Sequence, residues 1–213
     1  YNKKEVNMKK CFKIFWVFII GCLAGYVLEV AWHLIRTQTF QTRQGLIYGP
    51  FAPVYGLGTL AFYLVLPKIK NIFNVFWVSA LLGGITEYLC SYFQERLFGT
   101  ISWDYSGLFM NLDGRTSITY CILWGILGII FIKLIYPYIE KIFDKINMTV
   151  ITKFVTAFAV VFMVFNISIS SLAARRQYER REHIAPENEI DEFLDEHYPD
   201  EFMNKVYANK IEK

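Results

Sequence analysis

Long apolar segments, separated by short polar ones, dominate this chain. Each approaches the roughly 20 residues that an α-helix needs to cross the hydrocarbon core of a bilayer. Helices are expected because no water can satisfy backbone polar groups at that depth. The pattern therefore predicts an all-α fold, a polytopic helical membrane bundle. The five expected transmembrane helices cover about residues 12–35, 49–66, 72–92, 117–136 and 149–172.

The second apolar segment differs from the others because Pro50, Pro53, Gly56 and Gly58 lie near its start. Proline and glycine favour turns and breaks over continuous helix. Irregular backbone at membrane depth is tolerated only where it is buried in protein or lines a cavity. We therefore expect a broken second span, and the alternative is a segment that re-enters without crossing.

Composition agrees with a membrane protein, since 54% of the 213 residues are hydrophobic and only 19% are charged. The net charge of +3 is too small to indicate a nucleic-acid partner. The first apolar run is long and ends in charged residues, so no cleavable signal peptide is expected. Three parts are predicted: a basic cytoplasmic N-terminus at 1–11, a transmembrane domain at 12–172, and a polar, partly amphipathic tail at 173–213.

The orientation follows from the lysines ahead of the first span, among them Lys9 and Lys10. Basic residues favour the cytoplasmic side, which places the N-terminus inside. Five spans would then export the arginines of 175–181, against the same rule. The side of the membrane that holds the tail is therefore left open.

Two glutamates inside apolar spans are the main functional signal. A charge at membrane depth costs roughly 2.5 kcal/mol or more, so Glu29 and Glu87 indicate a polar site or pathway. The alternative is that they are interhelical hydrogen-bond partners. Gly25 lies one turn before Glu29, and Gly83 lies one turn before Glu87, so two faces with small residues can pack closely and meet each other.

Two loops carry the denser motifs, "RQGLIYGPFAPVYGLG" at 43–58 and "WDYSGLFMNLDGR" at 103–115. Arg43 and Arg115 offer planar forks that match a phosphate or carboxylate. The same arginines could instead neutralise the nearby acidic residues in structural salt bridges. The candidate substrate-binding or pathway residues are Glu29, Arg43, Tyr48, Tyr55, Glu87, Glu95, Asp104, Asn111 and Arg115.

Several chemistries are not expected. The chain carries neither a phosphate-binding loop nor a hydrolase motif, and its four cysteines are scattered without metal-ligand spacing. No metal, cofactor or nucleotide hydrolysis by the chain itself is therefore expected. No catalytic residue set can be named.

The tail alternates apolar and polar positions. Phe193 and Leu194 precede Pro199, and Phe202 and Val206 follow it, with Ile190 and Ile211 at the two edges. This spacing predicts two short amphipathic helices that dock on the bundle or bind a partner. The alternative is a solvated tail with little fixed structure.

The order of motifs resembles a known family. "GYVLEV" around Glu29, the first loop, "EYLCSYFQERLFG" from Glu87, the second loop and "WG" at 124–125 are similar to the bacterial ABC-transporter permeases labelled type IV or CmpB-like. The resemblance covers about residues 15–138. It implies a small multi-pass protein of the bacterial inner membrane and carries no known catalytic residues.

Three function classes remain. The resemblance implies a permease subunit that moves an anionic or amphiphilic substrate, with a separate ATPase supplying energy. The residues equally fit an intramembrane enzyme or lipid-binding protein that acts on an anionic lipid-like substrate, so enzyme activity is left open. A structural assembly factor is the third class. The expected partners are the lipid bilayer, the ATPase and, in a homo-oligomer, further copies of this chain.

Overall fold

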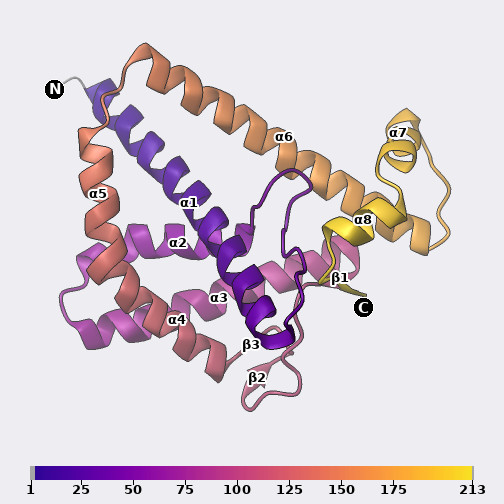
Figure 1. Cartoon of the computed structure of the whole chain (residues 1–213), viewed down its shortest axis with the longest axis horizontal. Helices are drawn as coiled ribbons and strands as arrows, with labels where there is room; N and C mark the ends of the chain where they lie inside the picture. The colour runs from indigo at the N-terminus through magenta and orange to yellow at the C-terminus, as the bar shows by residue number, and fades with distance from the viewer. Residues whose placement is uncertain (1–2, 213) are drawn as a thin grey trace.

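The fold is almost entirely helical (Figure 1). The structure is a computed structural model that describes residues 3–212. Its helices are α1 (Lys3–Thr37), α2 (Pro53–Val65), α3 (Ile72–Phe98), α4 (Ile118–Ile130), α5 (Tyr136–Lys145), α6 (Val150–Arg181), α7 (Glu189–His197) and α8 (Asp200–Val206). Short strands are β1 (Thr100–Ile101), β2 (Asn111–Leu112), β3 (Thr116–Ser117) and β4 (Ile211–Glu212), paired antiparallel as β1 with β4 and β2 with β3.

Within the described residues 3–212, four helical segments are long and apolar enough to cross a membrane, which confirms the polytopic helical bundle. Two of them are α3 and α6, a third is α1 from Glu5, and the fourth is Ile118–Lys145. This fourth segment joins α4 to α5 through a π-helical turn, η2 (Phe131–Ile135). It extends past the predicted end at residue 136, because the amphipathic α5 continues the helix among charged side chains.

The second apolar segment is broken, and the count of five spans stays a prediction. α2 has 13 residues, so it is about 20 Å long at 1.5 Å per residue, against roughly 30 Å of hydrocarbon. Pro53 stands in its first turn, and Gly49 has a φ of +87°, which excludes a helix through the residues before it. Residues 66–68 close the segment as a 3-10 turn, η1 (Leu66–Lys68).

The non-helical part of the second segment returns to the middle of α1. The backbone N–H of Ala52 donates to the carbonyl of Cys22 at 3.0 Å. α2 then runs back along α1 from this point toward its start, with Tyr55 facing Gly25 and Thr59 facing Gly21. The glycine face of α1 therefore packs on α2.

The glycine face of α3 packs on α4. A Cβ on Gly83 would lie 2.0 Å from the side chain of Trp124, and one on Gly128 would lie 1.8 Å from that of Ser79. Because lipid supplies no hydrophobic force between helices, such close backbone approach is what holds spans together. The expectation that the two glutamate-bearing faces pack directly on each other is wrong, since each face already has a different helix as its partner.

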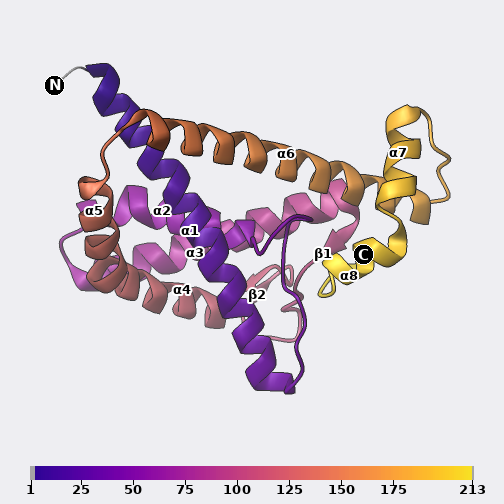
Figure 2. The same cartoon turned by 45° about the horizontal axis from the view of Figure 1, so that its top comes forward.

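α6 lies along one side of the other helices in both views (Figures 1 and 2). Near its start, Trp16 of α1 donates to Thr156 at 3.2 Å. Further along, the fully buried Asn166 accepts from the backbone N–H of Tyr48 at 3.1 Å and donates to its carbonyl at 2.7 Å. The polar residues of the last span thus hold the loop that leads into α2.

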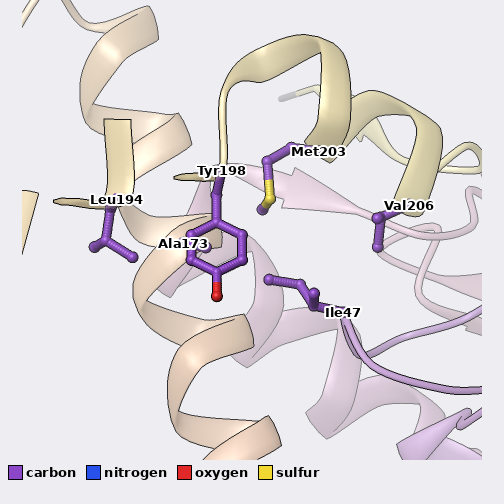
Figure 3. Packing of buried hydrophobic residues seen from close by; sticks show 6 residues of the cluster. All are labelled: Ile47, Ala173, Leu194, Tyr198, Met203 and Val206. Carbon is purple, nitrogen blue, oxygen red and sulfur yellow. The ribbon is translucent and has the colours of Figure 1, made fainter. Parts of the chain in front are cut away.

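The tail docks on the end of α6. The two predicted helices form as α7 and α8, and Pro199 is the N-cap of the second. Figure 3 shows the side chains that pack there, from the tail, from α6 and from the loop before α2. Ile190 and Phe193 were expected to face the bundle, yet both stay largely exposed. The buried residues are Ile47, Ala173, Leu194, Tyr198, Met203 and Val206.

Ion pairs join the start of α1 to the end of α5. The ammonium of Lys13 lies 2.7 Å from Glu140 and 3.0 Å from Asp144. At the opposite end of the fold, Arg175 and Arg181 of α6 donate to the last carbonyls of α3 at 3.4 and 3.0 Å. The tail therefore lies beside the end of α3, away from the N-terminus.

Candidate functional site

Glu87 is a buried carboxyl group at the meeting point of α3, α4 and the loop between them. Its side chain is 7% exposed. The hydroxyl of Thr116 donates to its Oε2 at 3.0 Å. The side chains of Trp124 and Tyr105 interact with the same carboxyl. Several polar partners therefore offset the cost of burying this group.

Glu29 on α1 is bound by Tyr55, which the break before α2 places opposite it. The phenol of Tyr55 donates to Oε1 of Glu29 at 2.5 Å. Tyr55 also interacts electrostatically with Glu87, and the two carboxyls interact with each other. The structure thus brings together three of the predicted site residues, Glu29, Tyr55 and Glu87. We call these three the carboxyl cluster.

Glycines make room for the aromatic rings of this cluster. A Cβ on Gly25 would lie 2.2 Å from Tyr55, and one on Gly58 would lie 2.8 Å from the indole of Trp124. The rings of Tyr55 and Trp124 are 5.6 Å apart. The glycines of α1, α2 and α3 therefore allow two large rings to reach the carboxyl groups.

Sequence reasoning missed part of the site. Tyr120 and Trp124 are four residues apart, which puts them on one face of α4, and Thr116 lies just before the helix in β3. Tyr120 stacks on Tyr105 with ring centroids 4.0 Å apart. The same spacing rule that singled out Glu29 and Glu87 could have found Tyr120 and Trp124.

The carboxyl cluster combines hydrogen-bond donors and acceptors in an apolar surrounding. Carboxyl groups can hold or release a proton, and the neighbouring phenol and hydroxyl groups can pass hydrogen bonds between them. Among the residues that the structure describes, neither Glu29 nor Glu87 forms an ion pair. The arrangement suits a polar, proton-binding contact point inside the bundle.

Arg115 lies outside the carboxyl cluster. It forms a structural salt bridge, which was the alternative to anion binding. Its guanidinium lies 2.7 Å from the carboxylate of Glu95 and 3.4 Å from the hydroxyl of Ser91. It also lies over the rings of Tyr88 and Tyr92, at 5.9 and 5.5 Å from their centroids. The pair Arg115 and Glu95 therefore belongs to the end of α3.

Arg43 serves a different element. Its Nη2 lies 2.5 Å from Nδ1 of His33, one turn beyond Glu29 on α1. Arg43 and Arg115 thus contact different helices. No contact between them is found in the described part of the chain, so a two-arginine grip on one anion is not formed here.

The remaining candidates shape loops. Asp104 accepts hydrogen bonds from the backbone and hydroxyl of Ser106, and Asn111 donates to the carbonyls of Ser106 and Leu108. The side-chain oxygen of Asn111 also accepts from the backbone N–H of Gly114, whose φ of +67° favours glycine. Tyr48 contacts α6 and the tail. A substrate role for Asp104, Asn111 and Tyr48 stays a prediction.

No metal-binding group of three or more His, Cys, Asp or Glu side chains occurs within residues 3–212. A family model described as putative ABC-transporter type IV matches residues 16–171. This range contains every candidate site residue, and it reaches past the predicted end of the resemblance to include most of α6. Neither a curated protein nor a solved structure matches the chain. The chain belongs to the putative ABC-transporter type IV family, which confirms the resemblance seen in its motifs.

Proposed function

We propose that this chain is the membrane subunit of a transporter, and that its substrate passes the carboxyl cluster while a separate ATPase supplies the energy. The observation that supports this proposal most directly is the shared environment of Glu29, Tyr55 and Glu87 inside the bundle. A helix-packing role would need only one hydrogen bond for each carboxyl. Here the phenol of Tyr55 binds Glu29 and lies within the electrostatic influence of Glu87, where four chain segments come together.

The substrate class that fits is amphiphilic. Apolar and aromatic side chains such as Trp124 surround the cluster, and its polar atoms are carboxyl, phenol and hydroxyl groups. Such atoms bind hydroxyl, amine or amide groups well. An anionic group is disfavoured, because the nearest arginines are held by His33 and Glu95. The enzyme alternative relied on two arginines at one anion, so it receives no support from this geometry.

The ATPase is expected at the end where α1 begins and α5 ends. A groove of about 540 Å³ lies there, lined by Lys9, Lys10 and Lys13 of α1 and by residues 146–148 after α5. The predicted orientation makes this the cytoplasmic end, where an ATPase has access to ATP. Lys9 and Lys13 already face Asp144 and Glu140, but Lys10 forms no ion pair among the described residues, and its charge favours an acidic partner surface.

The experiment starts from the tagged full chain, extracted in mild detergent and analysed for co-purifying proteins. A stoichiometric ATPase is expected, and the complex is then reconstituted in liposomes for ATP turnover. Glu87→Gln and Glu29→Gln should each lower the turnover by about tenfold, equivalent to about 1.4 kcal/mol of lost interaction. The matched control is Glu196→Gln, because Glu196 is an exposed tail carboxylate.

Two results would reject the proposal as a whole, and a third would reject the role of the carboxyl cluster alone. One is purification of the intact chain without any ATPase. The other is loss of folded protein from the membrane in both glutamine variants, which would assign Glu29 and Glu87 to helix packing. If both glutamine variants fold and keep full ATP turnover, the carboxyl cluster does not lie on the substrate pathway.

A further inference from the structure

We propose that a polar pocket between the ends of α3 and α6 binds a zwitterion of the phosphoethanolamine type, with a phosphate on one side and an ammonium on the other. This site is separate from the carboxyl cluster. Its volume is about 390 Å³, within the usual range of small-molecule sites. The lining residues are Glu95, Arg96, Gly99, Arg115, Tyr178 and Glu182.

The α3 wall of the pocket carries an excess of positive charge. The ring of Tyr92 holds two guanidinium groups, those of Arg96 and Arg115, each 5.5 Å from the ring centroid. Glu95 neutralises Arg115 at 2.7 Å. Within residues 3–212, Arg96 forms no ion pair. One net positive charge therefore stays on this wall.

Hydrogen-bonding capacity is also left over on the α3 wall. The guanidinium of Arg96 keeps its donors available while its face rests on Tyr92. Guanidinium forks match the geometry of phosphate oxygens. A phosphate at this wall would supply an acceptor to Arg96 and would lie beside the guanidinium of Arg115, which Glu95 already binds.

The α6 wall carries the opposite charge. Glu182 caps the end of α6, and its carboxylate is in no ion pair among the residues that the structure covers. It lines the same pocket as Arg96, but the two side chains do not pair with each other. An ammonium group is the natural partner for this carboxylate.

The walls are held in place by bonds that leave the pocket charges unused. Arg175 and Arg181 donate to the last carbonyls of α3, and their guanidinium groups lie 5.1 and 5.8 Å from the ring centroid of Tyr178. Gly99 ends α3 with a φ of +59°, and a Cβ there would lie 2.4 Å from the ring of Tyr178. Only glycine allows this ring to close onto the end of α3, so the pocket is preformed.

The charge arrangement selects a ligand with both signs. A simple anion would meet the arginines but also the two glutamates of the lining, and a simple cation would meet the reverse. A zwitterion places each charge against its complement. A lipid head group and a water-soluble phosphoethanolamine carry the same chemistry, so the test includes both.

The test uses the full-length protein in detergent, with bound molecules measured by native mass spectrometry. Three probes are added separately: phosphatidylethanolamine, phosphatidylglycerol and the soluble glycerophosphoethanolamine. Phosphatidylglycerol has the same phosphate without the ammonium. Retention of the ethanolamine lipid is expected to exceed that of phosphatidylglycerol by about tenfold, the effect of one charged contact.

Two single substitutions at exposed positions each remove the charge of one pocket wall. Arg96→Gln and Glu182→Gln should each lower ethanolamine-lipid retention by about tenfold. Arg36→Gln and Glu196→Gln are the matched controls, since both alter exposed charges elsewhere, and they should leave retention unchanged. The double exchange R96E with E182R should recover part of the binding.

Each outcome decides the question. Binding of the soluble probe with the same sensitivity to both variants supports the site and identifies a solute as its ligand. Binding of the lipid alone supports the site and identifies a head group. The proposal is overturned if both lipids are retained equally. It is also overturned if neither Arg96→Gln nor Glu182→Gln changes the retention of the ethanolamine lipid.

Discussion

The side-chain hydroxyls of Tyr48 and Tyr198 lie 2.7 Å apart, which joins the loop before α2 to the tail. The ring of Tyr48 also stacks on Phe165 of α6, at 6.2 Å between centroids. Tyr48 therefore contacts two elements that lie more than 100 residues away in the sequence. The shape of the loop that delivers Tyr55 to Glu29 depends on those distant elements.

Loss of this hydroxyl contact should loosen the tail. Tyr48→Phe and Tyr198→Phe should each cost about 1 kcal/mol of docking free energy, the usual net value of one hydrogen bond. The double variant should cost no more than either single one, because the same bond is removed. Amide hydrogen exchange over residues 189–206 measures the docking. Additive losses would show that the two hydroxyls act independently.

The buried amide of Asn166 should be more important for stability than the tyrosine pair. Asn166→Leu would leave both the N–H and the carbonyl of Tyr48 without their partner. Each buried, unsatisfied backbone group costs about 1–3 kcal/mol, so we expect a loss of about 3 kcal/mol. Thermal unfolding in detergent gives the value, with Val161→Leu as the control on the exposed face of α6. An unchanged midpoint would mean that the loop repacks without this amide.

Tail docking should depend on acid pH through Asp195. Hydrogen bonds from Arg176 and then Arg180 hold the pKa of its carboxyl below the usual 3.8. A lowered pKa contributes stability that is fully present above pH 3.8 and is lost as the pH falls through the value in the folded protein. Limited proteolysis should therefore release the tail only in strong acid. Asp195→Asn should loosen the tail at neutral pH and abolish this pH dependence.

Gly25→Ala should disturb the carboxyl cluster directly. The new methyl group would lie 2.2 Å from Tyr55, and overpacking of this kind costs about 1–3 kcal/mol. Gly107→Ala is the matched control, because nothing lies within 4 Å of a Cβ at that position. We expect a lower thermal midpoint for Gly25→Ala alone. Equal midpoints for the two variants would show that α1 and α2 separate easily.

Local patterns predicted the helices well, because span length and apolar character are properties of neighbouring residues. The prolines and glycines around the start of α2 predicted the break in the second segment for the same reason, although Gly56 and Gly58 lie within the helix itself. The partners of the polar residues were harder to predict from the sequence. Arg115 had several acidic candidates in the sequence, and only the close packing of α3 and α4 decides for Glu95. Likewise, spacing singled out Glu29 and Glu87 but gave no sign that Tyr55 would bind Glu29 and interact electrostatically with Glu87.

The side of the membrane that holds the tail can be decided with thiol labelling. Residues 43–52 and α2 together follow α1 back toward its start, so they can complete a fifth crossing despite the short helix. The tail then lies opposite the N-terminus. Its arginines do not act as free positive charges there, because Arg176 and Arg180 pair with Asp195 at 2.9 and 2.6 Å. The positive-inside rule counts Lys and Arg rather than net charge, so a tail on the outer side is an exception to it.

We therefore expect an impermeant maleimide to label Glu196→Cys in intact cells, whereas the exposed Cys11 should react only after the membrane is opened. A Cys11→Ser background serves as the control for labelling at Glu196→Cys. Labelling of both positions from the same side would mean that the second segment does not cross. The tail arginines would then lie with the lysines of α1.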